Sequence, residues 1–242
     1  NLLRQIGCKA DVQICETVTL TYICRMPQPG TVEVYRRTTN LHCAAFPGKH
    51  TPELLPQIQT VFPNVVAAKN VLETGFSNIN AIMHPAGMLG NAGWIEKSGG
   101  NFLWYYEGIT PSIGRWIDAV DGERVAMVRA LGLEPLRFVD IFHRAGLTSD
   151  AGRASGSAHR AIHDSEPNRT IKSPPSLDHR YIREDFGYGL VPMPEIGRLL
   201  GVKTPVMDAL ITLASTALGV DFEASVAYHR FVTELFFMAA RY

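Results

Sequence analysis

The chain has 242 residues, of which 46% are hydrophobic and 19% charged, and its 23 basic residues balance its 23 acidic ones. This composition excludes a disordered chain, and zero net charge provides no field that favours nucleic acid or an anionic membrane. No uninterrupted apolar run reaches the roughly 18 residues that a membrane-spanning helix needs. Nothing near Asn1 resembles a signal peptide, so we expect a folded cytoplasmic protein without nucleic-acid or membrane partners.

The four cysteines all lie in the first fifth of the chain, at Cys8, Cys15, Cys24 and Cys43. Their spacing matches neither a metal knuckle nor a disulfide-rich scaffold, so we predict buried, reduced thiols and no metal site. The chain begins at Asn1 without an initiator methionine and enters a helix-then-strand pattern directly. We therefore expect that upstream sequence is missing.

Residues 1–72 predict an α/β segment with few helices. Two extended runs, Thr31–Thr38 and Leu41–Phe46, are joined through Thr39 and Asn40, and this arrangement predicts a hairpin. We expect the end of a helix at Asn1–Gly7 and a strand at Asp11–Thr17. A helix is expected at Pro52–Val61, followed by a strand or strand-to-helix crossover at Val65–Leu72.

Residues 73–242 predict a mainly helical domain. Thr110 and Pro111 are typical of a helix start, a hydroxyl cap followed by a proline, and Gly132 ends that helix. The polar stretch Thr148–Pro175 predicts a long surface loop or a set of short turns. Further helices are expected at Leu136–Ala145, Glu195–Gly201, Pro205–Leu218 and Glu223–Ala240. The predicted fold class is therefore α+β, a partial Rossmann-type α/β segment followed by a mainly all-α domain.

One apolar run places two polar residues on the same helix face. Asn80 and His84 are four positions apart, which is about one helical turn. Pro85 follows directly, and because its ring removes a donor and clashes with the previous turn, we expect the helix to stop or bend there. A histidine at such a break is well placed to line a cavity. The alternative is a histidine with a purely structural role in the core.

The segment Asp178–Asp185 concentrates three basic and three acidic side chains in eight positions. One interpretation is a solvated face of salt bridges. The other brings one carboxylate to a histidine elsewhere in the fold, where it would fix the tautomer and raise the basicity of the imidazole. Such a histidine exchanges protons near neutral pH, and an arginine beside it binds a substrate carboxylate through two parallel hydrogen bonds.

Three stretches, "NINAIMHPAGMLGNAG", "WYYEGITPSIGRWIDAVDGER" and "HRYIREDFGYGLVPMPEIGRLLGVKTP", resemble the C-terminal helical domain of the opine dehydrogenases, the octopine/nopaline dehydrogenase family. The upstream "ETVTLTYICRMPQPGTVEVYRRT" is similar to the end of the nucleotide-binding domain of those enzymes. The resemblance extends from about Glu16 to Asp221. It implies a helical domain like the C-terminal domain of 6-phosphogluconate dehydrogenase.

The resemblance also implies roles for four residues. His84 would give and take the proton at the reacting carbonyl or imine, and Asp185 would hold and polarise that histidine. Asn80 would hydrogen-bond to substrate, and Arg180 would hold a substrate carboxylate. The implied reaction is the reductive condensation of an amino acid with a 2-oxo acid, with NAD or NADP as cofactor, and a homodimer is one implied assembly.

One feature of the family is missing from the sequence. The glycine-rich turn between a strand and a helix, which binds a dinucleotide pyrophosphate, does not occur in it. An alternative function is therefore a non-catalytic or truncated fragment that binds substrate or a partner without nucleotide. A third reading is a related 2-oxo-acid or 2-hydroxy-acid reductase.

Overall fold

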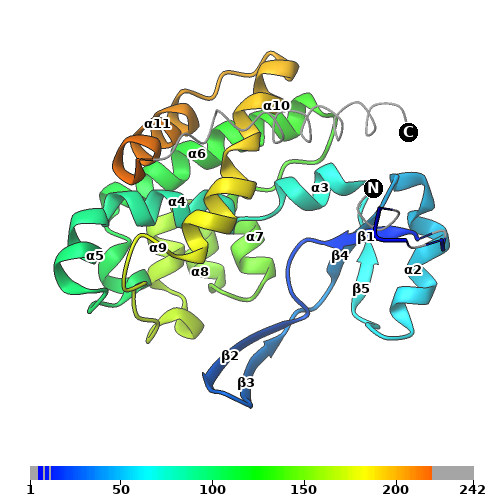
Figure 1. The fold of residues 1–242 in the computed structure, drawn as a ribbon, viewed down its shortest axis with the longest axis horizontal. Coiled ribbons are helices and arrows are strands. Elements are labelled where there is room, and N and C mark those ends of the chain that lie inside the picture. The colour runs from blue at the N-terminus through cyan, green and yellow to red at the C-terminus, as the bar shows by residue number, and fades with distance from the viewer. Residues whose placement is uncertain (1–4, 8, 11, 220–242) are drawn as a thin grey trace.

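The computed structural model describes residues 5–7, 9–10 and 12–219. A small β part and a larger helical body lie next to each other, and the short helix α3 (Val71–Phe76) connects them (Figure 1). This arrangement confirms the predicted α+β class with a helical domain.

The first sheet has three strands in the order β1 (Ile14–Thr17), β4 (Leu41–Phe46) and β5 (Val65–Ala67). Strand β1 runs antiparallel to β4, whereas β5 runs parallel to it. Helix α2 (Thr51–Gln59) is the crossover between the parallel pair, as such a pair requires. The apolar residues of this unit are Leu41, Cys43, Val65, Leu55 and Ile58.

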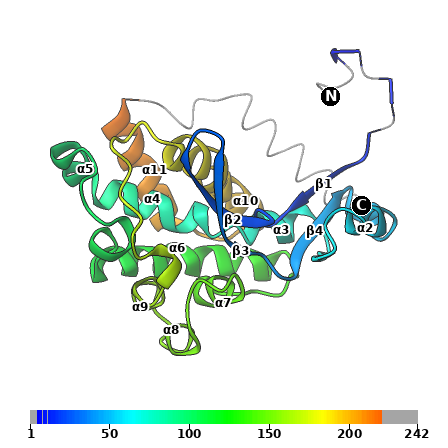
Figure 2. The same ribbon diagram turned by 90° about the horizontal axis from the view of Figure 1, so that it is seen from below.

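The predicted hairpin is wrong. Strand β3 (Thr31–Arg37) pairs instead with β2 (Tyr22–Gln28) in a separate two-stranded sheet, through a turn in which Gly30 has a φ of +82°. At Asn40, whose φ is +49°, the chain leaves this hairpin and enters the first sheet. Strand β2 was overlooked because a proline interrupts its run, which an edge strand tolerates. Figure 2 shows the hairpin extending away from β1 and β4.

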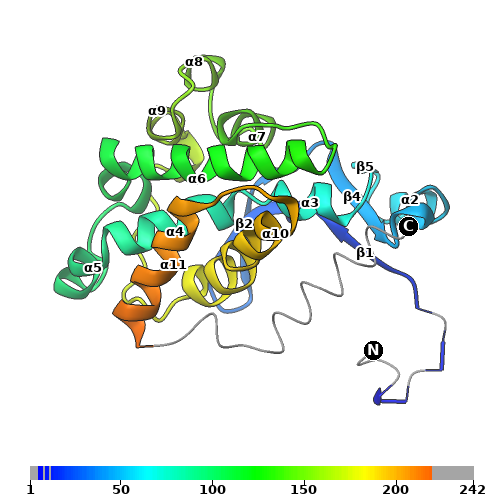
Figure 3. The same ribbon diagram turned by 90° about the horizontal axis from the view of Figure 1, so that it is seen from above.

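Helix α4 (Asn80–Gly90) crosses the middle of the helical body, where it packs against α6 (Pro111–Ala130) and the π-helix η4 (Tyr181–Leu190) (Figure 3). Residues 81–88 are all buried. Helix α4 does not stop at Pro85, one of the two outcomes predicted there, but continues to Gly90. The proline removes one hydrogen bond, but burial of a stretch that is apolar apart from His84 keeps the helix together.

The predicted helices after Thr110 are confirmed where the structure describes them. The Thr110 hydroxyl accepts a hydrogen bond from the backbone N–H of Ile113, as a cap should. The helix predicted at Glu223–Ala240 and the first residues of Asn1–Gly7 lie outside the described part. The remaining helices are α5 (Ala92–Ser98), α7 (Phe138–Arg144), α10 (Pro192–Leu200), α11 (Pro205–Leu218), the π-helix η2 (Trp104–Gly108) and the 3-10 turns Gly48–His50 and Glu166–Asn168.

The prediction of a long surface loop at Thr148–Pro175 is wrong, and the alternative, a set of short turns, is nearer to the structure. The stretch contains the short helices α8 (Asp150–Ala154) and α9 (Ala158–His163), and Ala161 and Ile162 of α9 are fully buried in the main core. Helices this short hold too few residues to show an apolar period in a sequence, and tertiary packing supplies most of their stability.

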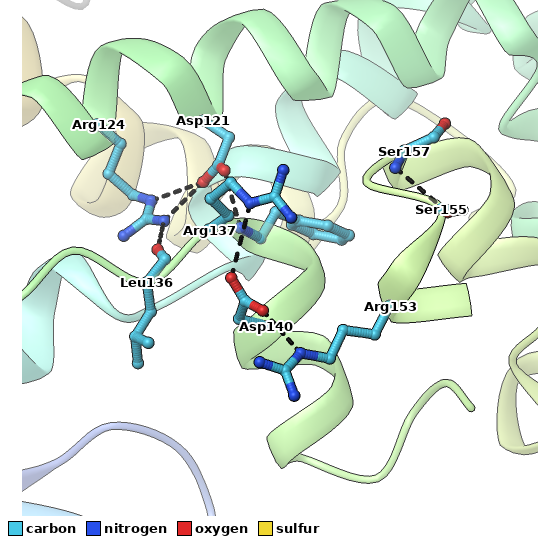
Figure 4. Close-up of polar contacts among 9 residues, drawn as sticks. Asp121, Arg124, Leu136, Arg137, Asp140, Arg153, Ser155 and Ser157 are labelled. Atoms are coloured by element: carbon cyan, nitrogen blue, oxygen red, sulfur yellow. Dashed lines mark hydrogen bonds and ion pairs between the residues drawn. The ribbon is translucent and has the colours of Figure 1, made fainter. Parts of the chain in front are cut away.

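A buried arginine in α6 joins three helices, and Figure 4 shows its contacts with Asp121 and Leu136. Arg124 in α6 donates to the Asp121 carboxylate at 2.9 Å, to the carbonyl of Phe76 at the end of α3 at 2.8 Å, and to the carbonyl of Leu136. Asp121 also accepts from the N–H of Phe138 at the start of α7 at 2.8 Å. Together, Arg124 and Asp121 thereby hold α6 to α3 and to α7.

Only one of the described cysteines is buried, although the sequence predicted burial for all of them. Cys43 is buried, Cys24 is partly exposed and Cys15 is exposed, while Cys8 lies outside the described residues. Among the described helices, none combines the length and the apolar character needed to cross a membrane.

Candidate functional site

The site is formed where α4 meets η4. His84 Nδ1 lies 2.8 Å from Asp185 Oδ2, although the two residues are 101 positions apart. Glycine allows this close packing, because a Cβ added at Gly189 of η4 would lie only 2.6 Å from the Cβ of Ala81 in α4. Two predicted site residues from distant parts of the chain are thus hydrogen-bonded to each other.

The imidazole of His84 is 4% exposed and has a defined orientation. The ring of Tyr181 stacks on it with a centroid distance of 3.6 Å and an interplanar angle of 16°. Its other nitrogen, Nε2, is buried and has no hydrogen-bond partner among the described residues. Because a carboxylate only accepts, Nδ1 donates to Asp185 when the imidazole is neutral, and the lone pair is then on Nε2.

Burial lowers the pKa of His84 below the ordinary value of 6.5, and the nearby Arg180 acts in the same direction. Asp185 raises this pKa through its hydrogen bond and its charge, but burial outweighs the carboxylate. The rise in the basicity of His84 that was expected from a carboxylate partner is therefore only one of several contributions to its pKa. In the free protein at neutral pH, His84 is a neutral proton acceptor.

A pocket of about 750 Å³ adjoins this pair, and its walls come from the β part, from α4, from α7 and from η4. The structure brings all four predicted site residues to this pocket: Asn80, His84, Arg180 and Asp185. Asn80 is exposed and begins α4. The Arg180 side chain is 65% exposed and pairs with Glu184 at 3.1 Å, so a substrate carboxylate would have to compete with Glu184 for it.

Each of the two interpretations of the segment Asp178–Asp185 holds for a different part of it. Arg183 pairs with Asp178, and Arg180 pairs with Glu184, on exposed positions that form a solvated face. Asp185 instead points inward to His84, with its side chain 13% exposed.

Three residues that the sequence interpretation did not assign to the site also line the pocket: Tyr105, Asn168 and Tyr181. Tyr181 is adjacent to Arg180, so the charged motif itself contained the signal. Tyr105 and Asn168 are 5% and 6% exposed and come from η2 and a 3-10 turn. No local pattern in the sequence places either of them beside His84.

The described residues contain no group of three or more histidine, cysteine or carboxylate side chains that could hold a metal ion. They also contain no glycine-rich turn between a strand and a helix. The imidazole of His84, which Asp185 and Tyr181 orient beside the pocket, can bind a small substrate and move a proton at Nε2.

The sequence model described as "NAD/NADP octopine/nopaline dehydrogenase, alpha-helical domain" matches residues 67–218. An opine dehydrogenase of Arthrobacter sp. (strain 1C) is 36% identical over 221 residues, which are 91% of this chain and 60% of that protein. The protein ocs of Agrobacterium tumefaciens (strain Ach5) is 28% identical over 88% of this chain and 58% of its own length. The chain thus spans about three fifths of the length of these relatives.

Solved structures share the fold. An octopine dehydrogenase in complex with NADH and agmatine has a TM-score of 0.71 at 21% identity, and the match covers 92% of this chain and 62% of that one. Apo yersinopine dehydrogenase has a TM-score of 0.74 at 11% identity, over 99% of this chain and 68% of that one. With the family model matching more than half of the sequence, we conclude that this chain belongs to the opine dehydrogenase (octopine/nopaline dehydrogenase) family and contains its α-helical domain.

Proposed function

We propose that the protein acts in the NAD(P)-dependent condensation of an amino acid with a 2-oxo acid, with His84 as the proton-transfer group. The observation that supports this most is the buried, unpartnered Nε2 of His84, whose tautomer Asp185 fixes through Nδ1 at 2.8 Å. The pocket of about 750 Å³ is large enough for a small dicarboxylic product, since small-molecule sites span roughly 300–1,000 Å³.

His84 has two tasks in this proposal. Its Nε2 accepts a proton from the ammonium group of the amino acid, which frees the amine to attack the carbonyl carbon of the 2-oxo acid. The former carbonyl oxygen needs two protons to leave as water: the imidazolium returns the first, and His84 then carries the second from the attacking nitrogen to this oxygen, so that a protonated imine remains. The Asp185 carboxylate stabilises the imidazolium between these steps, and Arg180 and Asn80 position the substrate through a carboxylate and a hydrogen bond.

The hydride that reduces the imine in this family comes from nicotinamide, and solved relatives are described with NADH and NADP+ bound. The described residues of this chain do not form a pyrophosphate cradle, so we assign no cofactor contact to them. NAD and NADP thus both remain as the proposed cofactor.

The substrate class is proposed from the relatives. Octopine dehydrogenase structures are described with agmatine, with L-arginine and with pyruvate, which are small amines or oxo acids. We also propose the division into residues 1–72 and 73–242, because the small apolar cluster of the sheet is separate from the main core. A cytoplasmic location remains a prediction.

The test is to mix the protein with NADH or NADPH and a 2-oxo acid, with and without an amino acid, and to follow loss of the reduced nicotinamide. We expect oxidation that depends on the amine and that the His84→Asn variant lacks. Equal oxidation without amine would instead identify a 2-oxo-acid reductase.

The missing glycine-rich turn favours a second candidate, a substrate-binding module without catalysis. Titration of NADH and NADPH while monitoring thermal stability separates the two, because a ligand that binds the folded state raises its melting temperature. If an opine stabilises the protein and neither nucleotide does, the binding module is the better description.

A further inference from the structure

The charges around the pocket are unevenly distributed. Five side chains that line it can be positive, and four of them have a carboxylate close by: the pairs are His42–Glu73 at 3.8 Å, His84–Asp185 at 2.8 Å, His143–Asp150 at 2.9 Å and Arg180–Glu184 at 3.1 Å. Arg144 is the fifth, and in the described part of the chain no carboxylate lies within ion-pair distance of it.

Both acids that line the pocket are already hydrogen-bonded. Among the described lining residues, only Glu73 and Asp185 are acidic. Glu73 accepts from the backbone N–H of Lys69 at 2.7 Å, and Asp185 accepts from Nδ1 of His84 at 2.8 Å. An added guanidinium or ammonium would have to compete with one of these hydrogen bonds, and Arg144 would repel it. Both effects weaken the binding of a cation in a partly desolvated site.

Arg144 also has a defined position. It belongs to the last turn of α7, and Ile141, Phe142 and Leu147 form the apolar wall next to it. The guanidinium of Arg36, in β3, donates to the carbonyl of Gly146 at 2.8 Å and ties the hairpin to the turn that follows α7. Since Arg144 itself is exposed, this wall is apolar inside and has an unpaired positive charge at its edge.

We propose that Arg144 selects the amino donor by the charge of its side chain, favouring anionic side chains, accepting neutral ones and rejecting cationic ones. This inference rests on the proposed function, since it assumes that an amino acid occupies the pocket. Like charges at a binding site suppress the wrong partner and opposite charges favour the right one.

The experiment measures dissociation constants of three stable products, the N-(1-carboxyethyl) derivatives of alanine, glutamate and arginine, by calorimetry with and without NADH. Wild-type protein should bind the glutamate derivative best and the arginine derivative least. In Arg144→Glu this order should reverse, and the ratio of the dissociation constants of the glutamate and arginine derivatives should change about tenfold or more. The ratio for Arg144→Gln should lie between those of the wild type and Arg144→Glu. The alanine derivative has no charged side chain, so its constants give the effect of each substitution on the two carboxylates that all three products share, and added salt should reduce the change in ratio.

The matched control is Arg129→Glu. Arg129 is also an exposed arginine in the last turn of a helix, α6, but it does not line the pocket. A ratio that stays constant in Arg144→Glu, or that moves equally in Arg129→Glu, would overturn the selection by Arg144 and leave the proposed function intact. If none of the three derivatives binds the wild-type protein, both proposals fail.

Discussion

At the scale of single residues, the two nitrogens of His84 have opposite environments. Nδ1 is bonded to a carboxylate, whereas Nε2 is buried without a partner. An unpaired buried polar atom costs free energy, and such atoms are rare in folded proteins unless they have a role. The Nε2 atom is therefore the position at which a substrate group would make the most favourable new hydrogen bond.

We expect Asp185→Asn to lower kcat about 10²–10⁴-fold with little change in fold, because the neutral amide cannot stabilise the imidazolium. Steady-state kinetics with circular dichroism as a check on folding would measure this. Asp178→Asn is the control, since Asp178 belongs to the same segment but pairs with Arg183 in an exposed position. Equal activity losses in the two variants would contradict the role of Asp185.

The lowered pKa of His84 also predicts how stability depends on pH. At pH values between the lowered pKa of His84 in the folded protein and its ordinary pKa of 6.5, the unfolded chain binds a proton at this residue that the folded protein does not bind. The free energy of unfolding should therefore fall as the pH decreases from about 7.5 to 5.5. His159 and His179, whose pKa values are also lowered, contribute with the same sign.

Urea unfolding at several pH values measures the contribution of His84 alone. His84→Asn should reduce the loss of stability on acidification, whatever its effect on stability at neutral pH. Asn80→Ala changes the same helix without removing a titrating group, so it should retain the wild-type pH dependence. An identical slope in the wild type and in His84→Asn would show that the histidine is not held neutral by burial.

At the scale of elements, the contact between α4 and η4 places His84 against Asp185. We expect Gly189→Ala to weaken product binding and to cost about 1–3 kcal/mol of stability, because the new methyl group would collide with Ala81. Gly187→Ala is the matched change in the same segment, since a Cβ there would be 3.6 Å from its nearest neighbour. Calorimetry and urea unfolding should show a much smaller effect for Gly187→Ala.

The buried arginine of α6 should be important for stability. Arg124→Met leaves Asp121 as an uncompensated buried charge and frees two carbonyls, so we expect a loss of about 3–5 kcal/mol in the free energy of unfolding. Arg198→Met breaks an ion pair with Glu195 at an exposed position and should cost less than about 1 kcal/mol. Similar losses for the two variants would contradict the importance of burial.

The elements that the sequence predicted correctly have strong local signals. The Thr110 cap and the long apolar period identified α6, and the apolar run around His84 identified α4. Strand pairing did not follow from local signals, because β3 and β4 are neighbours in sequence but belong to different sheets. The short helices α8 and α9 were missed for a related reason, since their stability comes from packing.

At the scale of the whole molecule, the pocket depends on residues that no local pattern connects. His84 and Asp185 were paired by resemblance to a family, because a separation of 101 positions shows no periodicity. Asn168 and the hairpin residues at the same pocket were not predicted, since their positions follow from how the β part and the helical body pack together.

The π-helix η4 has one further consequence. Each hydrogen bond in a π-helix closes over five residues instead of four, so this turn holds one residue more than an α-helical turn. Deleting a single residue within one such turn should let that turn tighten to the ordinary winding, so that the side chains beyond it keep nearly the same direction about the helix axis. A carboxylate that follows such a wide turn is thus less sensitive to the loss of one residue than a carboxylate on an α-helix, where the same loss rotates every later side chain by about 100°.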